Sequence, residues 1–134
     1  MSVSDDIERL LKLRTVAVVG CSADPRRPSN QVARYLLEVG YRVIPVNPNH
    51  AEILGEKCYP DLASVREPIE VVDVFRRPEA AGEAVDQAVA AGALGVWLQD
   101  GVRAPEAEAR ARARGLTVVV DDCLMRQHLS RMGR

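Results

Sequence analysis

A chain of 134 residues, of which 47% are hydrophobic, has the size and composition of one globular domain with one core. Its formal net charge of -1 excludes a general electrostatic attraction to nucleic acid or to a membrane surface. The cysteines Cys21, Cys58 and Cys123 form no C-x-x-C pair, which argues against a disulfide framework or a zinc site. Without a signal peptide or a membrane-length apolar run, we expect a single cytoplasmic domain over residues 1–134.

Short apolar runs alternate with amphipathic segments along the whole chain. The apolar runs are rich in valine and too short for helices, which favours buried strands. The amphipathic segments have apolar residues at helical spacing, and several end at glycine. In chain order the sequence predicts helix 4–13 capped by Ser4, strand 16–19, helix 30–39, strand 41–46, a helical turn at 51–54 closed by Gly55, an extended piece at 58–60, a short helix at 61–65 capped by Asp61, strand 70–75, helix 78–91, strand 94–98, helix 105–114, strand 116–120 and helix 123–132 capped by Asp122.

This alternation predicts a Rossmann-like three-layer α/β/α fold with a five-stranded, mostly parallel sheet. We expect the strand order 3-2-1-4-5. The strands then end along one edge of the sheet, at Gly20, Asn47, Phe75, Gln99 and Asp121. In open α/β sheets this carboxyl edge is where ligands bind.

The loop after the first strand has phosphate-binding features but lacks the dinucleotide fingerprint. That fingerprint is G-x-G-x-x-G, whereas here Gly20 is followed by Ser22 and Pro25 in the positions of the later glycines. Arg26 and Arg27 give the loop two guanidinium groups, which pair well with phosphate. From this loop alone, a phosphate site and a solvated basic loop are equally good interpretations.

The ends of the second and third strands carry further polar groups. Asn47 and Pro48 stand where an NAD-binding domain usually has an acidic residue for the adenosine ribose, which counts against NAD and would admit a ribose phosphate. The alternative is an ordinary Asn-Pro turn. Phe75, Arg76 and Arg77 lie where the third strand opens onto a helix that begins at Pro78. Two neighbouring turns thus hold four arginines, which suits a ligand with several negative charges.

Four stretches together resemble the small stand-alone CoA-binding proteins, which are similar to the N-terminal CoA-binding domain of the succinyl-CoA synthetase α subunit. These stretches are Gly20–Ser29, Tyr41–Pro48, Val74–Pro78 and Val96–Gln99, and they span most of the chain in order. The resemblance implies coenzyme A bound at the strand carboxyl ends. It implies a diphosphate site at Gly20, Ser22, Arg26, Arg27, Pro28 and Ser29, with Cys21 also among the cofactor-binding residues. It further implies an adenosine site at Asn47 and Pro48, a nucleotide border at Phe75, Arg76 and Arg77, and a pantetheine contact at Gln99.

Catalytic chemistry finds little support in the sequence. His50 and His128 have no serine or cysteine nucleophile nearby in sequence, so we interpret both as structural or exposed. Asp121 and Asp122 are adjacent and point apart, which argues against a paired acid and base. Trp97, in a buried strand, is expected in the core.

Two cysteines leave an alternative open. Cys21 and Cys123 both follow strands at the predicted ligand edge. Either could form a mixed disulfide with the CoA thiol, or both could be small packing residues.

The leading hypothesis is a module that binds CoA or an acyl-CoA without catalysis of its own, as a carrier, sensor or regulatory unit. Its partner is then a small molecule and neither nucleic acid nor membrane. One rival is an NAD(P)-binding, oxidoreductase-like domain, which the missing glycines oppose. The other is an interaction subunit that has lost its ligand, which the intact arginines oppose.

Overall fold

The computed structural model describes residues 2–132. The strands of its main sheet are β1 (Thr15–Val19), β2 (Arg42–Val46), β5 (Val71–Val74), β6 (Gly95–Leu98) and β7 (Thr117–Val119). The helices are α1 (Val3–Leu11), α2 (Pro28–Glu38), α3 (Pro78–Ala90), α4 (Pro105–Ala113) and α5 (Leu124–Arg131). The strands are all parallel, in the order β2-β1-β5-β6-β7. The predicted Rossmann-like α/β fold is therefore confirmed.

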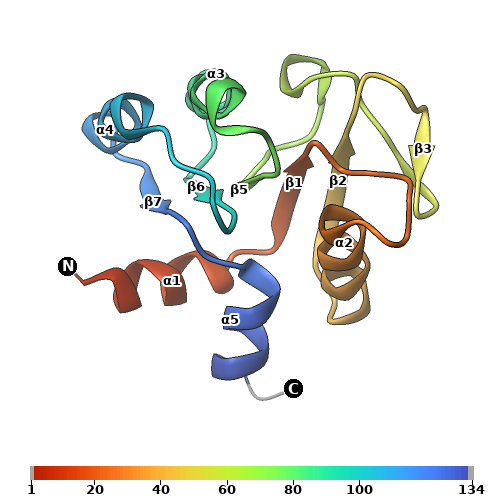
Figure 1. The fold of residues 1–134 in the computed structure, drawn as a ribbon, viewed down its shortest axis with the longest axis horizontal. Helices are drawn as coiled ribbons and strands as arrows, with labels where there is room; N and C mark the ends of the chain where they lie inside the picture. Colours follow the sequence, from red (N-terminus) through yellow and green to blue (C-terminus); the bar gives the residue numbers. More distant parts are fainter. Residues whose placement is uncertain (1, 133–134) are drawn as a thin grey trace.

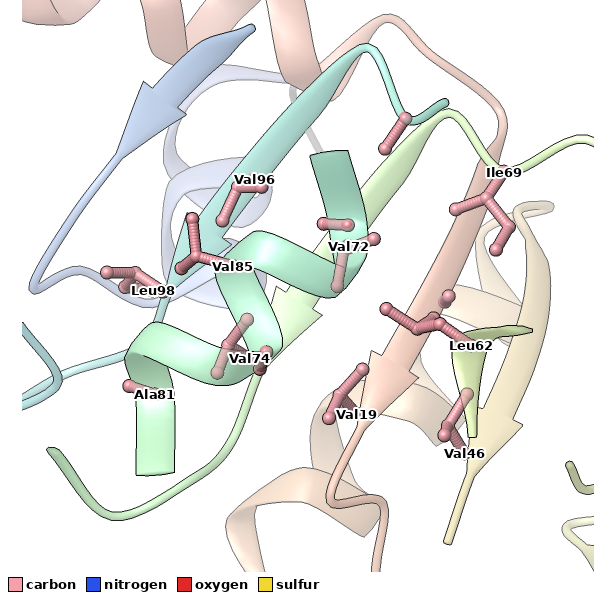
Figure 2. Close-up of a cluster of buried hydrophobic side chains, with 14 of the residues drawn as sticks. Val19, Val46, Leu62, Ile69, Val72, Val74, Ala81, Val85, Val96 and Leu98 are labelled. Carbon is pink, nitrogen blue, oxygen red and sulfur yellow. The ribbon is translucent and has the colours of Figure 1, made fainter. Parts of the chain in front are cut away.

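Helices cover both faces of the sheet (Figure 1). α3 and α4 pack on one face, and α1, α2 and α5 pack on the other. Successive residues of β5 point to opposite faces and so enter two separate cores. Val72 and Val74 pack against Val85 of α3 (Figure 2), whereas Val71 belongs to the core under α1, α2 and α5. Asp73 is fully buried on the same side as Val71.

The strand order differs from the predicted order 3-2-1-4-5. With only the sheet strands counted in chain order, the observed order is 2-1-3-4-5, because β5 pairs with β1. β2 is an edge strand, and Pro45 within it has no N–H for a further strand. Tyr59 covers that edge: its N–H donates to the Pro45 carbonyl at 3.1 Å, and its carbonyl accepts from the Asn47 N–H at 2.9 Å.

Because β2 lies on one side of β1 and β5 lies on the other, the direction of the strand order reverses between β1 and β5. Such a point of reversal is where open α/β sheets bind ligands.

Residues 51–54 were predicted as a helical turn and instead form part of a small hairpin. β3 (Glu52–Ile53) pairs antiparallel with β4 (Glu56–Lys57). Leu54 and Gly55 connect them with φ angles of 55° and 77°. Two successive positive φ angles are the geometry of a type I′ hairpin turn, which a helical turn cannot contain.

Two of the predicted helix caps were wrong and one is confirmed. α1 is capped by Ser2, whose hydroxyl accepts from the Asp5 N–H at 3.1 Å, and the Asp5 carboxylate bonds back to the Ser2 N–H. The N-cap of α5 is Cys123 rather than Asp122. The short 3-10 helix η1 (Leu62–Ser64) is capped as predicted, because Asp61 accepts from the Ser64 N–H at 2.9 Å.

Glu108 is a buried carboxylate that holds the start of α4 in place. It accepts from the Ala104 N–H at 2.8 Å and from Nε and Nη2 of Arg103 at 3.0 and 2.9 Å. Burial opposes its charge, but these bonds and the charges of Arg103 and Arg112 outweigh burial and hold the pKa of Glu108 below its ordinary value. Its contribution to stability is therefore present at neutral pH and lost as pH falls through the folded-state pKa.

We expect Glu108→Gln to lower the free energy of unfolding by about 1–3 kcal/mol at pH 7, because the charge-assisted pairing with Arg103 is lost. Urea denaturation measures this. Glu106→Gln is the matched control, since Glu106 is exposed on the same helical turn and should change stability by less than about 0.5 kcal/mol. Equal effects of the two substitutions would show that the Arg103 pair adds no stability.

Candidate functional site

Two adjacent hollows open at the carboxyl edge of the sheet. The apolar hollow has a volume of about 440 Å³ and is lined by Pro28, Gln31, Val32, Phe75, Arg76, Arg77, Gln99, Asp100, Val102, Cys123 and Met125. The loop hollow has a volume of about 360 Å³ and is lined by Gly20, Ser22, Ala23, Arg27, Pro28, Ser29, Asn47, His50 and Phe75. Pro28 and Phe75 line both hollows, so the two are adjacent, and we call them together the carboxyl-edge groove. It lies where the strand order reverses, between β1 and β5.

Gly20 sets the close approach of β1 and β5 at the floor of this groove. Its φ angle is +83°, and a Cβ atom there would lie 2.1 Å from the carbonyl oxygen of Phe75. The Gly20 N–H donates to the Val46 carbonyl at 3.0 Å, and the Phe75 N–H donates to the Val19 carbonyl at 2.9 Å. Only glycine therefore fits at the end of β1.

The loop between Gly20 and α2 is held by its own polar groups. The Ser22 N–H donates to the Ser29 hydroxyl at 2.9 Å, and the Asn30 side chain donates to the Ser22 carbonyl at 2.9 Å. Asn47 ties the loop to β2, because its Nδ2 donates to the Cys21 carbonyl at 2.9 Å. The loop is thus shaped before any ligand binds, and its Ser22 N–H is already used.

The free donors are at the start of α2. Its N-cap is Arg27, and Pro28 is its first residue. Within residues 2–132, no side chain caps this helix, and the backbone N–H groups of Ser29 and Asn30 donate to no acceptor. Free N–H groups and the positive end of the helix dipole favour an anion at this position.

The four arginines that were predicted to contact the ligand differ in whether their guanidinium groups are already paired within the protein. Arg26 is bound to Asp24, with Nε and Nη2 donating to the two carboxylate oxygens at 3.1 and 3.0 Å, and its side chain is 88% exposed. This contact lowers the pKa of Asp24, as does, more weakly, the charge of Arg27. In the described part of the chain, Arg27, Arg76 and Arg77 make no hydrogen bond or ion pair through their guanidinium groups. Three uncommitted positive charges therefore border the groove.

With this geometry in place, comparison with known proteins identifies the family. Residues 14–128 match the CoA-binding domain family. The chain belongs to this family. The uncharacterized protein YneT of Bacillus subtilis is 36% identical over 121 residues, which are 90% of this chain and 90% of YneT.

Solved structures extend the comparison. A hypothetical protein from Pyrococcus horikoshii OT3 superposes with a TM-score of 0.93 and 42% identity, over 99% of this chain and 94% of that chain. The dinucleotide-forming acetyl-coenzyme A synthetase 1 of Ca. Korarchaeum cryptofilum superposes with a TM-score of 0.73 and 28% identity, over 84% of this chain and 27% of that chain. The CoA-binding domain fold therefore occurs both as a small chain and as part of a larger synthetase.

Most of the residues that the sequence singled out in this CoA-binding domain do gather at the groove. Three predicted residues line neither hollow: Arg26 is turned to Asp24, Pro48 is exposed, and Cys21 is fully buried. The residues brought together are Gly20, Ser22, Arg27, Pro28, Ser29, Asn47, Phe75, Arg76, Arg77 and Gln99.

Sequence reasoning gave no role in the groove to His50, Gln31 or Met125. His50 lines the loop hollow near Asn47, and its position just after a strand end was the available signal. Gln31 lies in the first turn of α2, and Met125 in that of α5. Both line the apolar hollow, but nothing in the sequence shows which side of a helix start faces a neighbouring strand end.

Several polar residues outside the groove have structural roles. His128 is buried, bonds the Tyr35 hydroxyl through Nδ1 and packs edge-on against the rings of Tyr35 and Tyr41, which confirms its structural interpretation. Trp97 is confirmed in the core, and its Nε1 donates to the Asp122 carbonyl at 3.0 Å.

Residues 2–132 include no helix long and apolar enough to cross a membrane, and no group of three histidine, cysteine or acidic side chains arranged to hold a metal ion.

Proposed function

We propose that this protein binds coenzyme A or an acyl-CoA along the carboxyl-edge groove and serves as a carrier, sensor or regulatory module without catalysis of its own. The observation that carries the proposal is the polarity of the groove. The loop hollow has the free N–H donors at the start of α2 and the unpaired Arg27, whereas the second hollow is lined mostly by apolar groups, together with Arg76 and Arg77. CoA has the same division, with phosphates at one end and an uncharged arm at the other.

The phosphate end of the ligand fits the start of α2. The free N–H groups of Ser29 and Asn30 and the guanidinium group of Arg27 would meet the diphosphate. Charge-assisted bonds of this kind contribute about 1.5–3 kcal/mol each. Arg76 and Arg77 line the neighbouring apolar hollow together with Pro28 and Phe75, which also line the loop hollow, and would meet phosphate from there.

The adenosine end fits the loop hollow, where Asn47 and His50 lie. None of the described residues that line this hollow is acidic. A carboxylate would favour free ribose hydroxyls, as in NAD, and would repel a ribose phosphate. Its replacement by Asn47 therefore favours a nucleotide with a phosphate on the ribose. CoA and NADP share that feature, so a titration must separate them.

The arm of the ligand fits the apolar hollow beside Val32, Val102 and Met125. Among the described residues, no histidine lines this hollow, where the thiol or acyl end would lie. Besides apolar groups, the lining includes the amide of Gln99, the thiol of Cys123 and the charged side chains Arg76, Arg77 and Asp100. Since none of these described residues is a histidine that could activate the thiol, the hollow supports a binding role rather than acyl transfer.

Calorimetric titration of the reduced protein with CoA, dephospho-CoA and NADP tests the proposal. We expect CoA to bind more tightly than either of the other ligands, since dephospho-CoA lacks the ribose phosphate and NADP lacks the pantetheine arm. Tighter binding of NADP would favour the oxidoreductase-like alternative. No heat with millimolar CoA would overturn the proposal.

Neighbouring arginines provide a matched pair of variants. We expect Arg27→Ala to weaken CoA binding roughly 10- to 100-fold, because the contact between phosphate and a guanidinium group that has no other partner is lost. Arg26→Ala should change the dissociation constant less than about threefold, because Arg26 is committed to Asp24 and lines neither hollow. The same calorimetric titration measures both. Equal effects of the two variants would mean that the loop attracts CoA by total charge alone.

A further inference from the structure

The three cysteines of this chain have different surroundings. Cys21 is fully buried, and burial, with smaller effects of Cys58 and Asp73, raises the pKa of its thiol to about 12. Burial also raises the pKa of Cys58, whose thiol donates to the Asn47 carbonyl at 3.5 Å. Neither thiol lines the carboxyl-edge groove. Cys123 is also largely buried, at 8% exposed, but it lines the apolar hollow at the N-cap of α5.

Gln99 gives an independent indication of a ligand in the same hollow. It is 5% exposed, and its Oε1 accepts from the Leu124 N–H at 3.3 Å. This bond fixes the orientation of the side-chain amide, since an N–H group needs the oxygen as its partner. The Nε2 group has no acceptor among residues 2–132, although Gln99 lines the hollow. A nearly buried amide donor without a partner suits the carbonyl oxygen of an amide or a thioester.

The groove therefore orders the parts of a CoA-like ligand. Phosphates at the start of α2 leave the arm to run past Phe75 into the apolar hollow. The amide carbonyls of the arm can accept from Gln99, and its terminal sulfur then lies at the wall that Cys123 forms. Arg126, on the same turn of α5, forms ion pairs with Asp100 and Asp122 at 2.9 Å, so it brings no uncompensated positive charge to this thiol.

We propose that Cys123 is a covalent attachment site for the thiol of CoA, formed by exchange with a CoA disulfide. The proposal rests on the proposed function, because the groove must first bind the nucleotide end. The Cys123 thiolate attacks one sulfur of the disulfide, a bond forms between the Cys123 Sγ and that sulfur, and the disulfide bond of the reagent breaks. The other CoA leaves as a thiolate and takes up the proton that Cys123 lost, so electrons and atoms balance without a further oxidant.

Intact-mass measurement of the purified protein with the symmetrical disulfide of CoA tests the assignment. We expect one CoA to attach to each chain, peptide mapping to place it on Cys123, and a thiol reductant to remove it. Cys123→Ser should abolish the adduct. Attachment at Cys21 or Cys58, or no attachment while the reduced protein binds CoA in the calorimeter, would overturn this inference and leave the proposed function intact. Absence of CoA binding by the reduced protein would overturn both.

Oxidised glutathione is the matched reagent, because it is a disulfide without a nucleotide. We expect Cys123 to react with CoA disulfide at least roughly tenfold faster than with oxidised glutathione when both are dilute, since the groove positions only the former. Arg27→Ala should slow the reaction with CoA disulfide and leave the reaction with oxidised glutathione unchanged. Equal rates with both reagents, or an equal effect of Arg27→Ala on both, would show that Cys123 reacts with any disulfide without help from the groove and would overturn the inference.

Discussion

Replacement of Gly20 by alanine is expected to lower the free energy of unfolding by about 2–5 kcal/mol, since both strain and a collision act at this residue. The φ angle of +83° disfavours any residue with a Cβ atom. The added Cβ atom would also lie 2.1 Å from the Phe75 carbonyl oxygen, which is fixed in the backbone at the end of β5. Relief requires β1 and β5 to separate at their carboxyl ends, and the groove has its floor there.

Gly101→Ala separates these two causes. Gly101 has a similar φ angle of +78°, but a Cβ atom there would meet nothing within 4 Å. Gly101→Ala should therefore lower the free energy of unfolding by the backbone strain alone, about 1–2 kcal/mol. Urea denaturation of both variants gives the difference, which measures the collision with Phe75. If Gly20→Ala is no more destabilising than Gly101→Ala, the end of β1 moves freely and does not fix the shape of the groove.

The fold class followed from the alternation of apolar runs and amphipathic segments, but the strand order did not. The hydrophobic period and the length of a segment identify it as a strand, but they do not show which strands pair with it. Pro45 did contain the information, because a proline inside a strand favours a sheet edge, and the predicted order placed that strand between two others. The hairpin at Leu54 and Gly55 was missed because its turn lacks the Asn-Gly or Asp-Gly pair that usually marks such turns.

The candidate site was predicted at the level of loops and not at the level of single side chains. Arg26 and Arg27 are equivalent in sequence, and only the fold shows that Asp24 takes the first and leaves the second at the groove. Cys21 and Cys123 were likewise equivalent as residues after strands. They differ because Cys21 is fully buried and lines neither hollow, whereas Cys123 begins a helix and lines the apolar hollow.

Asp73 is the least favourable buried group in the described part of the chain. It lies in β5 between Val18 of β1 and Trp97 of β6, is fully buried, and has no hydrogen-bond partner for either carboxylate oxygen within residues 2–132. Burial raises its pKa well above the ordinary value. The folded protein therefore holds this proton more tightly than the unfolded chain does, and the contribution of Asp73 to stability falls as pH rises above about 4.

We expect Asp73→Asn to be more stable than the natural protein at neutral pH, since asparagine has nearly the same shape and no charge to bury. The gap should widen by up to about 1.4 kcal/mol for each pH unit between pH 4 and the folded-state pKa of Asp73, and then stay constant. Urea denaturation of both proteins from pH 4 to pH 8 measures it. Other carboxylates, such as Glu108, titrate in both proteins and cancel in the difference. A gap that does not change with pH would mean that Asp73 ionises as readily in the folded protein as in the unfolded chain, through water or a movement of β5.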